Sequence, residues 1–141
     1  MDLTKTPPRS VRETIHGIVQ LARTIDKAKA VVQGRFGEYR YDCPMDRGLF
    51  DFLGMDSQEF LNIVKTARDN FGIEAYARVF LAKKDARSIE AFNEHWLSDL
   101  PTGDSLEAFY ELRAKVAPTR TDVTSWPDLL DLEEGRTVPL R

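Results

Sequence analysis

Apolar residues recur every three or four positions along much of the chain, and this spacing limits the folds that it can adopt. The clearest stripe comprises Ile15, Ile18, Leu21, Ala22, Ile25, Ala28 and Val32. This period places the residues on one face of an α-helix. We predict that the helix runs from about residue 12 to residue 33, because Gly34 follows as a stop signal. The opposite face carries His16, Gln20, Arg23 and Lys27 and is expected to be solvated.

Capping and stop signals divide the remaining sequence into further helices. Asp56–Glu59 and Asp104–Glu107 both have the Asp-x-x-Glu pattern of a capping box. The predicted helices cover about residues 45–53, 57–71, 73–84, 88–100, 105–116 and 125–132, with Phe71 and Tyr76 expected on buried faces. The chain is therefore expected to form a compact all-α bundle of six to seven helices in a single domain, residues 1–141. Residues 1–10 are expected to form an extended arm, and residues 137–141 a C-terminal tail.

One short stretch departs from the helical pattern. In residues 37–43, Tyr39, Tyr41 and Cys43 alternate with Glu38, Arg40 and Asp42. Alternation of this kind predicts an extended segment with one face in the core and the other in solvent. An exposed strand edge can pair with another chain, so Glu38–Asp42 is a candidate docking edge.

Composition excludes several classes of protein. The net charge of −3 and the lack of a basic stripe disfavour nucleic-acid binding. The longest apolar run, Val79–Ala82, is too short to span a membrane. A single cysteine, Cys43, and the lack of a secretory signal favour the cytoplasm. The charge is uneven, +3 over residues 1–47 and −4 over residues 99–141, which would assist a head-to-tail contact between two copies.

No motif for a metal or a cofactor is present. The two histidines lie 79 positions apart, outside any zinc-binding spacing, and Asp42 and Asp46 lack the ligand series of a calcium loop. The glycine-rich motifs of nucleotide-binding proteins and the Gly-x-Ser-x-Gly motif of serine hydrolases are also absent. We therefore expect no metal and no cofactor.

A cationic cluster is the most specific candidate site. Arg23 and Lys27 lie one turn apart on the first predicted helix, and Arg40 follows in the extended segment. Together they are suited to hold a carboxylate or a phosphate. The candidate ligand-binding residues are Arg23, Lys27, Tyr39, Arg40, Tyr41, Cys43 and Asp46. The alternative is structural: these cations belong to the helix surface, or Arg23 pairs with an acid of residues 39–46.

Cys43 also has two interpretations. A nucleophilic thiol needs a base, and the histidines His16 and His95 are both expected to be solvated. A cysteine also packs well as a small apolar side chain, so a buried structural thiol is the simpler interpretation. The aromatic residues Tyr39, Tyr41, Phe50, Phe52 and Trp126 can likewise fill the core or line a pocket.

One set of segments is spread over nearly the whole chain: Asp2–Thr4, Pro7–Ser10, Leu21–Ala30, Gly37–Tyr39, Tyr41, Cys43–Asp46, Phe52–Gly54, Arg120–Val123 and Trp126–Asp131. In these segments the chain resembles the bacterial family called domain of unknown function 5069. The resemblance implies a small bacterial cytosolic protein and supplies no activity and no site residues.

Two functions therefore remain open, and the sequence does not decide whether the protein is an enzyme. The first is a non-enzymatic module that binds another protein or itself. The second is a small anionic-ligand binding protein or enzyme, with its site between the first helix and residues 37–46.

Overall fold

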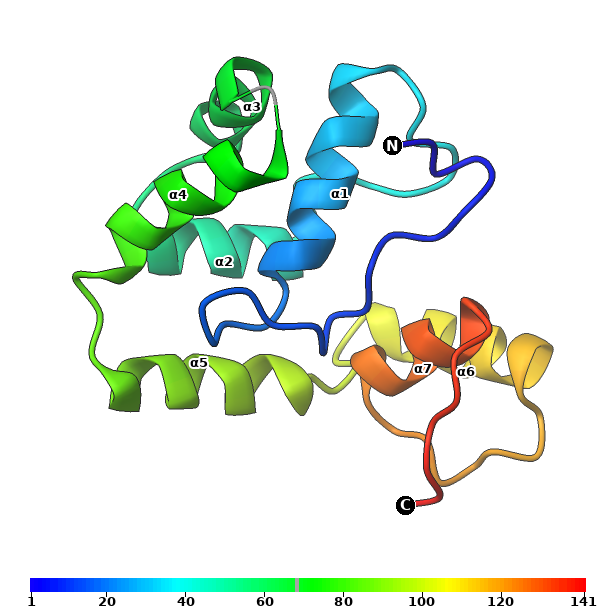
Figure 1. The fold of residues 1–141 in the computed structure, drawn as a ribbon. Coiled ribbons are helices and arrows are strands. Elements are labelled where there is room, and N and C mark those ends of the chain that lie inside the picture. The colour runs from blue at the N-terminus through cyan, green and yellow to red at the C-terminus, as the bar shows by residue number, and fades with distance from the viewer. Residues whose placement is uncertain (68) are drawn as a thin grey trace. The chain divides into compact units, whose positions relative to one another are not determined.

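A computed structural model describes residues 1–67 and 69–141, and it is helical throughout its regular structure. The helices are α1 (Leu21–Val32), α2 (Pro44–Leu53), α3 (Ser57–Ala67), α4 (Asn70–Leu81), α5 (Ala86–Leu97), α6 (Ser105–Val116) and α7 (Trp126–Glu133). No β-strand occurs in these described residues, where the only pairing is an isolated bridge between Ile15 and Ile18. The predicted all-α class with six to seven helices is confirmed, with seven helices in the described residues (Figure 1).

The chain divides into two compact units, Met1–Asn93 and Glu94–Arg141. The boundary falls within α5, whose last residues belong to the second unit. The single domain expected for residues 1–141 stays a prediction.

In the first unit, α1 packs against α3, and α3 also contacts α2 and α4 (Figure 1). The apolar core includes the fully buried side chains of Ile18, Leu21, Ile25, Leu49 and Ile73. Of the predicted apolar stripe, Leu21, Ala22, Ile25 and Ala28 of α1 are buried as expected, whereas Val32 at the end of the helix is 40% exposed.

The predicted start of the first helix is wrong. Residues 15–18 form a tight turn, in which the backbone N–H of each bridging isoleucine donates to the carbonyl of the other, at 3.2 and 3.1 Å. His16 and Gly17 both have positive φ within this turn, and Gln20 has a φ of 71° immediately before α1. Because the left-handed region is incompatible with a continuing α-helix, α1 begins at Leu21. Ile15 and Ile18 matched the helical period without belonging to the helix.

The boundary between α3 and α4 also differs from the prediction. α3 ends at Ala67, and the Asp69 side chain caps α4 by accepting a 2.9 Å hydrogen bond from the backbone N–H of Gly72. Gly72 therefore lies in the first turn of α4 and does not end a helix. A Cβ at this position would lie 2.8 Å from the Ala67 carbonyl oxygen, so the close approach of the two helix ends requires glycine.

This shift changes which side of α4 is buried. Phe71 is 82% exposed and Tyr76 is 45% exposed, whereas both were expected in the core. The buried face of α4 consists of Ile73, Ala77 and Leu81, at spacings of four residues, and of these Ala77 was expected there.

The second unit has a small core of its own. Phe109 of α6 packs with Val123 and Leu129, and the ring of Trp126 meets the Phe109 ring edge-on at 4.9 Å. The Arg120 guanidinium is held by Asp122 and donates to the carbonyls of Val138 and Pro139, which fastens residues 137–141. The hydrogen bonds from Arg120 and from the backbone of Arg141 hold the pKa of Asp122 well below its usual value. The predicted cap at Asp104 is wrong, since its side chain makes no capping hydrogen bond.

Candidate functional site

The polar face of α1 is buried, which contradicts the expectation that it faces solvent. Gln20, Arg23, Thr24, Asp26 and Lys27 are each at most 5% exposed. Burying charged side chains is costly unless each is paired and hydrogen-bonded. The partners of these side chains therefore determine what the cluster can do.

The N-terminal arm covers one part of this face. Asp26 accepts hydrogen bonds from the backbone N–H of Arg9 at 2.8 Å and from its guanidinium at 3.1 Å. Arg23 donates to the Arg9 carbonyl at 3.1 Å, and its guanidinium lies 5.8 Å from the centre of the Tyr39 ring. Asp26 and Arg23 thus serve to hold the arm against the helix.

Lys27 and Asp46 form a buried ion pair at the centre of the cluster. Their side chains are 5% and 0% exposed, and Lys27 Nζ lies 2.7 Å from Asp46 Oδ2. The other carboxylate oxygen accepts from the Thr24 hydroxyl at 2.7 Å and from the Gln20 amide at 2.9 Å. The pair joins α1 to the first turn of α2.

The protonation of Asp46 reflects two opposing effects. Burial raises the pKa of this carboxyl, but the charge of Lys27 and hydrogen bonds from Lys27, Thr24 and Gln20 outweigh it. The net pKa lies below its usual value, so Asp46 is ionised at neutral pH.

Cys43 lies beside this pair at the N-terminus of α2. Its Sγ accepts from Lys27 Nζ at 3.3 Å and from the backbone N–H of Asp46, while the Asp46 side chain accepts from the Cys43 backbone N–H at 3.2 Å. The thiol is half-buried. Lys27 is therefore the charged neighbour that the sequence, with its two distant histidines, did not reveal.

The remaining predicted residues are more scattered. The Arg40 side chain is exposed, and only its carbonyl joins the cluster by accepting from Lys27 at 3.0 Å. The Tyr41 hydroxyl donates to the Ser57 carbonyl at 2.6 Å, and burial together with the charges of Asp46, Asp42 and Asp56 raises its pKa. The structure thus brings together Lys27, Cys43 and Asp46.

Residues 37–43 contain two turns and no strand. Asp42 is the only non-glycine residue among them with positive φ. The predicted alternation survives only partly. Glu38 and Arg40 are exposed and Tyr39, Tyr41 and Cys43 are half-buried, but Asp42 is half-buried too. The turns leave no strand edge at Glu38–Asp42 for pairing with another chain.

The contacts of Lys27 decide what this cluster can bind. An ammonium group has three hydrogens, and Lys27 Nζ has three acceptors: Asp46, the Arg40 carbonyl and Cys43. No donor of Lys27 is left for a ligand, which favours the structural interpretation of this cation. Sequence reasoning missed Gln20 and Thr24 as members of the cluster. Gln20 precedes Thr24 by four residues and Thr24 precedes Lys27 by three, a spacing that places all three on one helix face. Gln20 Oε1 has no hydrogen-bond partner in the described part of the chain.

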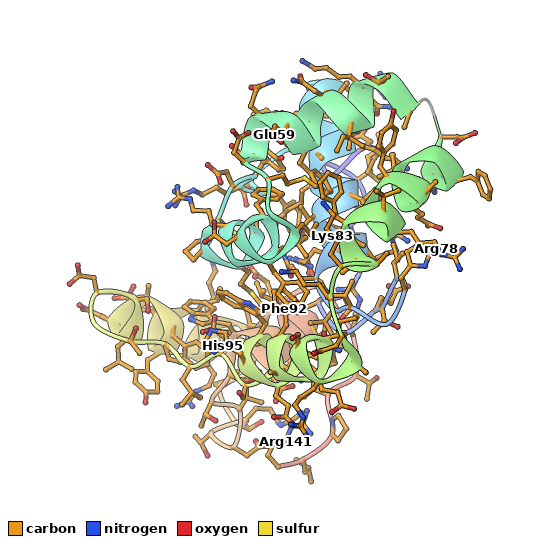
Figure 2. All side chains as sticks on the ribbon, turned by 90° about the vertical axis from the view of Figure 1, so that its left-hand side faces the viewer. Glu59, Arg78, Lys83, Phe92, His95 and Arg141 are labelled. Carbon is orange, nitrogen blue, oxygen red and sulfur yellow. The ribbon has the colours of Figure 1, made fainter. Side chains whose placement is uncertain are left out.

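A second feature, on the outer side of α4, was not predicted. A groove of about 330 Å³ is lined by His16, Phe71, Glu74, Ala75, Arg78, Val79 and Ala82, and is called the α4 groove below. Phe71 and Val79 are 82% and 64% exposed, and Arg78 extends from the helix into solvent (Figure 2). Clustered exposed apolar side chains on one helix face mark interaction surfaces.

The second unit has a comparable surface on α6. A shallow depression is lined by Leu106, Glu107, Tyr110, Glu111 and Ala114. One face of the Tyr110 ring is covered by the Arg113 guanidinium at 4.8 Å. Two of the side chains that line the depression, Glu107 and Glu111, are acidic, and none of the lining side chains is basic.

The described residues, 1–67 and 69–141, offer neither a metal-binding cluster nor a helix that could span a membrane. No group of three or more His, Cys, Asp or Glu side chains is placed to hold a metal ion. No described helix is both long and apolar enough to cross a membrane. The predictions that the protein needs no metal and no cofactor stay predictions.

Comparison with known proteins identifies a family. A search among curated proteins found no match. The family model described as domain of unknown function (DUF5069) matches residues 5–136, nearly the whole chain. This match confirms the resemblance to that family. The chain belongs to the DUF5069 family.

Proposed function

We propose that this protein is a non-enzymatic self-association module and that the α4 groove is its contact surface. The observation that carries the proposal is the exposed apolar stripe of α4. Phe71, Ala75, Val79 and Ala82 lie at intervals of three and four residues on the outer side of the helix, all exposed. Burying a phenylalanine side chain that is exposed in the free chain contributes roughly 1.5–3 kcal/mol to association.

A second copy is the occupant because the groove complements itself. It offers a large side chain, Phe71, and small ones, Ala75 and Ala82, which leave room for such a side chain. It also carries one acid and one base, Glu74 and Arg78. A surface that carries both a large and a small side chain, and both an acid and a base, can bind a second copy of itself.

The alternative, a small anionic ligand held by Arg23, Lys27 and Arg40, has less support. Lys27 Nζ has three acceptors in its own chain, and the Arg40 side chain is exposed to solvent. The proposal includes a bacterial cytosolic setting, supported by the family resemblance and by the free thiol of Cys43, which suits a reducing compartment.

Sedimentation velocity of Phe71→Asp tests the proposal. We expect this variant to lower the association constant at least about tenfold, since tenfold corresponds to about 1.4 kcal/mol and the lost burial exceeds that. Leu140→Asp is the matched control, because Leu140 is also 82% exposed but lies in the C-terminal tail. Equal association by the two variants would contradict the assignment of the surface to α4.

A further inference from the structure

We infer that two copies pair antiparallel along α4, related by a two-fold axis, and that the assembly closes at two subunits. This inference rests on the proposed self-association and names the surface of the partner. It follows from the order of large, small, acidic and basic residues along the helix.

The sizes of the side chains along α4 favour the antiparallel arrangement. Phe71 lies at the N-terminal end of the α4 groove, and Ala82 lies at its C-terminal end. An antiparallel arrangement places the N-terminal end of one helix beside the C-terminal end of the other. Each Phe71 then rests over Ala82 of the second copy, a large side chain against a small one. A parallel arrangement would set the two phenylalanines side by side and the two alanines side by side, leaving a gap at one end.

The charges on α4 favour the same antiparallel arrangement. Glu74 and Arg78 are four residues apart and therefore lie on the same flank of the stripe. When a two-fold axis relates antiparallel helices, equal flanks meet, so Glu74 lies opposite Arg78 of the second copy, and the reverse contact repeats it. In a parallel pair, each flank of one helix meets the opposite flank of the other helix. Glu74 of one copy and Arg78 of the other are then separated.

A two-fold contact limits the assembly to two copies. A two-fold contact uses the same patch on both copies, so the groove is fully occupied once a pair has formed. A single helix face on each copy buries less than a standard interface of about 1,600 Å². The dimer is therefore expected at high protein concentration, with no larger species formed through α4.

Charge reversal in separate and mixed samples tests the pairing by sedimentation velocity. Glu74→Arg alone puts two like-charged Arg–Arg contacts into its own dimer, and Arg78→Glu alone puts in two Glu–Glu contacts. Each variant should associate roughly tenfold more weakly than wild type, since each dimer loses two ion pairs and gains two repulsions. An equimolar mixture restores both Arg–Glu contacts and should recover the wild-type association constant as a one-to-one heterodimer.

Two further variants complete the design. Glu90→Arg on α5 is the control for charge reversal on an exposed helix position outside the groove, and it should associate like wild type. The double variant Glu74→Arg/Arg78→Glu swaps the two charges and should dimerise by itself. It also replaces the mixture if either single variant has an altered circular dichroism spectrum.

The outcomes separate the two proposals. If wild type associates but neither the mixture nor the double variant recovers association, the antiparallel pairing is wrong while self-association stands. If Phe71→Asp weakens association while charge reversal has no effect, the α4 groove is used in another geometry. If wild type stays monomeric throughout, both proposals are overturned.

Discussion

Replacing Lys27 with methionine will destabilise the first unit strongly, because it leaves the Asp46 carboxylate buried without its counter-ion. The Asp46 side chain is 0% exposed, and the Lys27 side chain is 5% exposed. Breaking a buried ion pair by removing one partner costs about 3–5 kcal/mol. Asp46 keeps its hydrogen bonds from Thr24, Gln20 and the Cys43 backbone, so we expect the lower end, about 3 kcal/mol.

Chemical denaturation followed by circular dichroism measures this change, and a thermal melt provides a second readout. For a unit of this size, about 3 kcal/mol corresponds to a fall in Tm of roughly 10–20 °C. Lys65→Met is the matched control, because Lys65 is an exposed lysine in the last turn of α3. The control should change the free energy of unfolding by less than about 0.5 kcal/mol.

A double variant separates the lost ion pair from lost packing. In Lys27→Met/Asp46→Leu neither position of the pair keeps a buried charge without its partner, so this protein should be more stable than Lys27→Met alone. Two results would refute the reasoning: equal stabilities of Lys27→Met and Lys65→Met, or a double variant less stable than the single one. Either would mean that the two side chains do not form a buried pair.

Three further predictions follow from the same structure. Asp46→Asn should make the free energy of unfolding depend less on pH under acidic conditions. The pKa of Asp46 is lowered in the folded protein, so its contribution to stability is present above about pH 4 and is lost as the pH falls through the folded pKa. Urea unfolding between pH 2 and 7 checks this, and parallel curves for wild type and variant would contradict it. Gly72→Ala should destabilise the protein by at least about 1 kcal/mol, since its Cβ would lie 2.8 Å from the Ala67 carbonyl oxygen; an unchanged urea midpoint would rule out the close approach of α3 and α4. Asp69→Ala should cost about 1 kcal/mol by removing the cap of α4, whereas Asp104→Ala, which removes no cap, should cost only a few tenths; equal losses would show that both aspartates cap alike.

The helical class and most helix positions could be predicted because they depend on local patterns. The apolar period, the Asp56 cap and the prolines act over a few residues, and the structure places α2, α6 and α7 close to the expected ranges. Period alone cannot reveal where a stripe leaves the helix. Ile15 and Ile18 fit the spacing of α1, yet the positive φ of His16 and Gln20 breaks the helix before Leu21.

The candidate site was predicted in part. Lys27, Cys43 and Asp46 lie together, as expected from their joint selection. No local sequence pattern, however, indicates that the polar face of α1 is covered. That cover comes from Arg9 and the loop at Arg40, which are distant in sequence, and only long-range contacts bring them to α1. The exposure of Phe71 was not predicted for a related reason. Because α3 ends at Ala67, Phe71 belongs to α4 and lies on its exposed face, not in the core.

The measurement that tests the central claim most directly is the molar mass of the wild-type protein as its concentration rises. Sedimentation equilibrium up to about 1 mM covers the weak affinities expected of a small interface. The account predicts a mass that rises from that of one 16.1 kDa chain towards twice that value and levels off there. A mass that stays at one chain at every concentration would contradict self-association through α4.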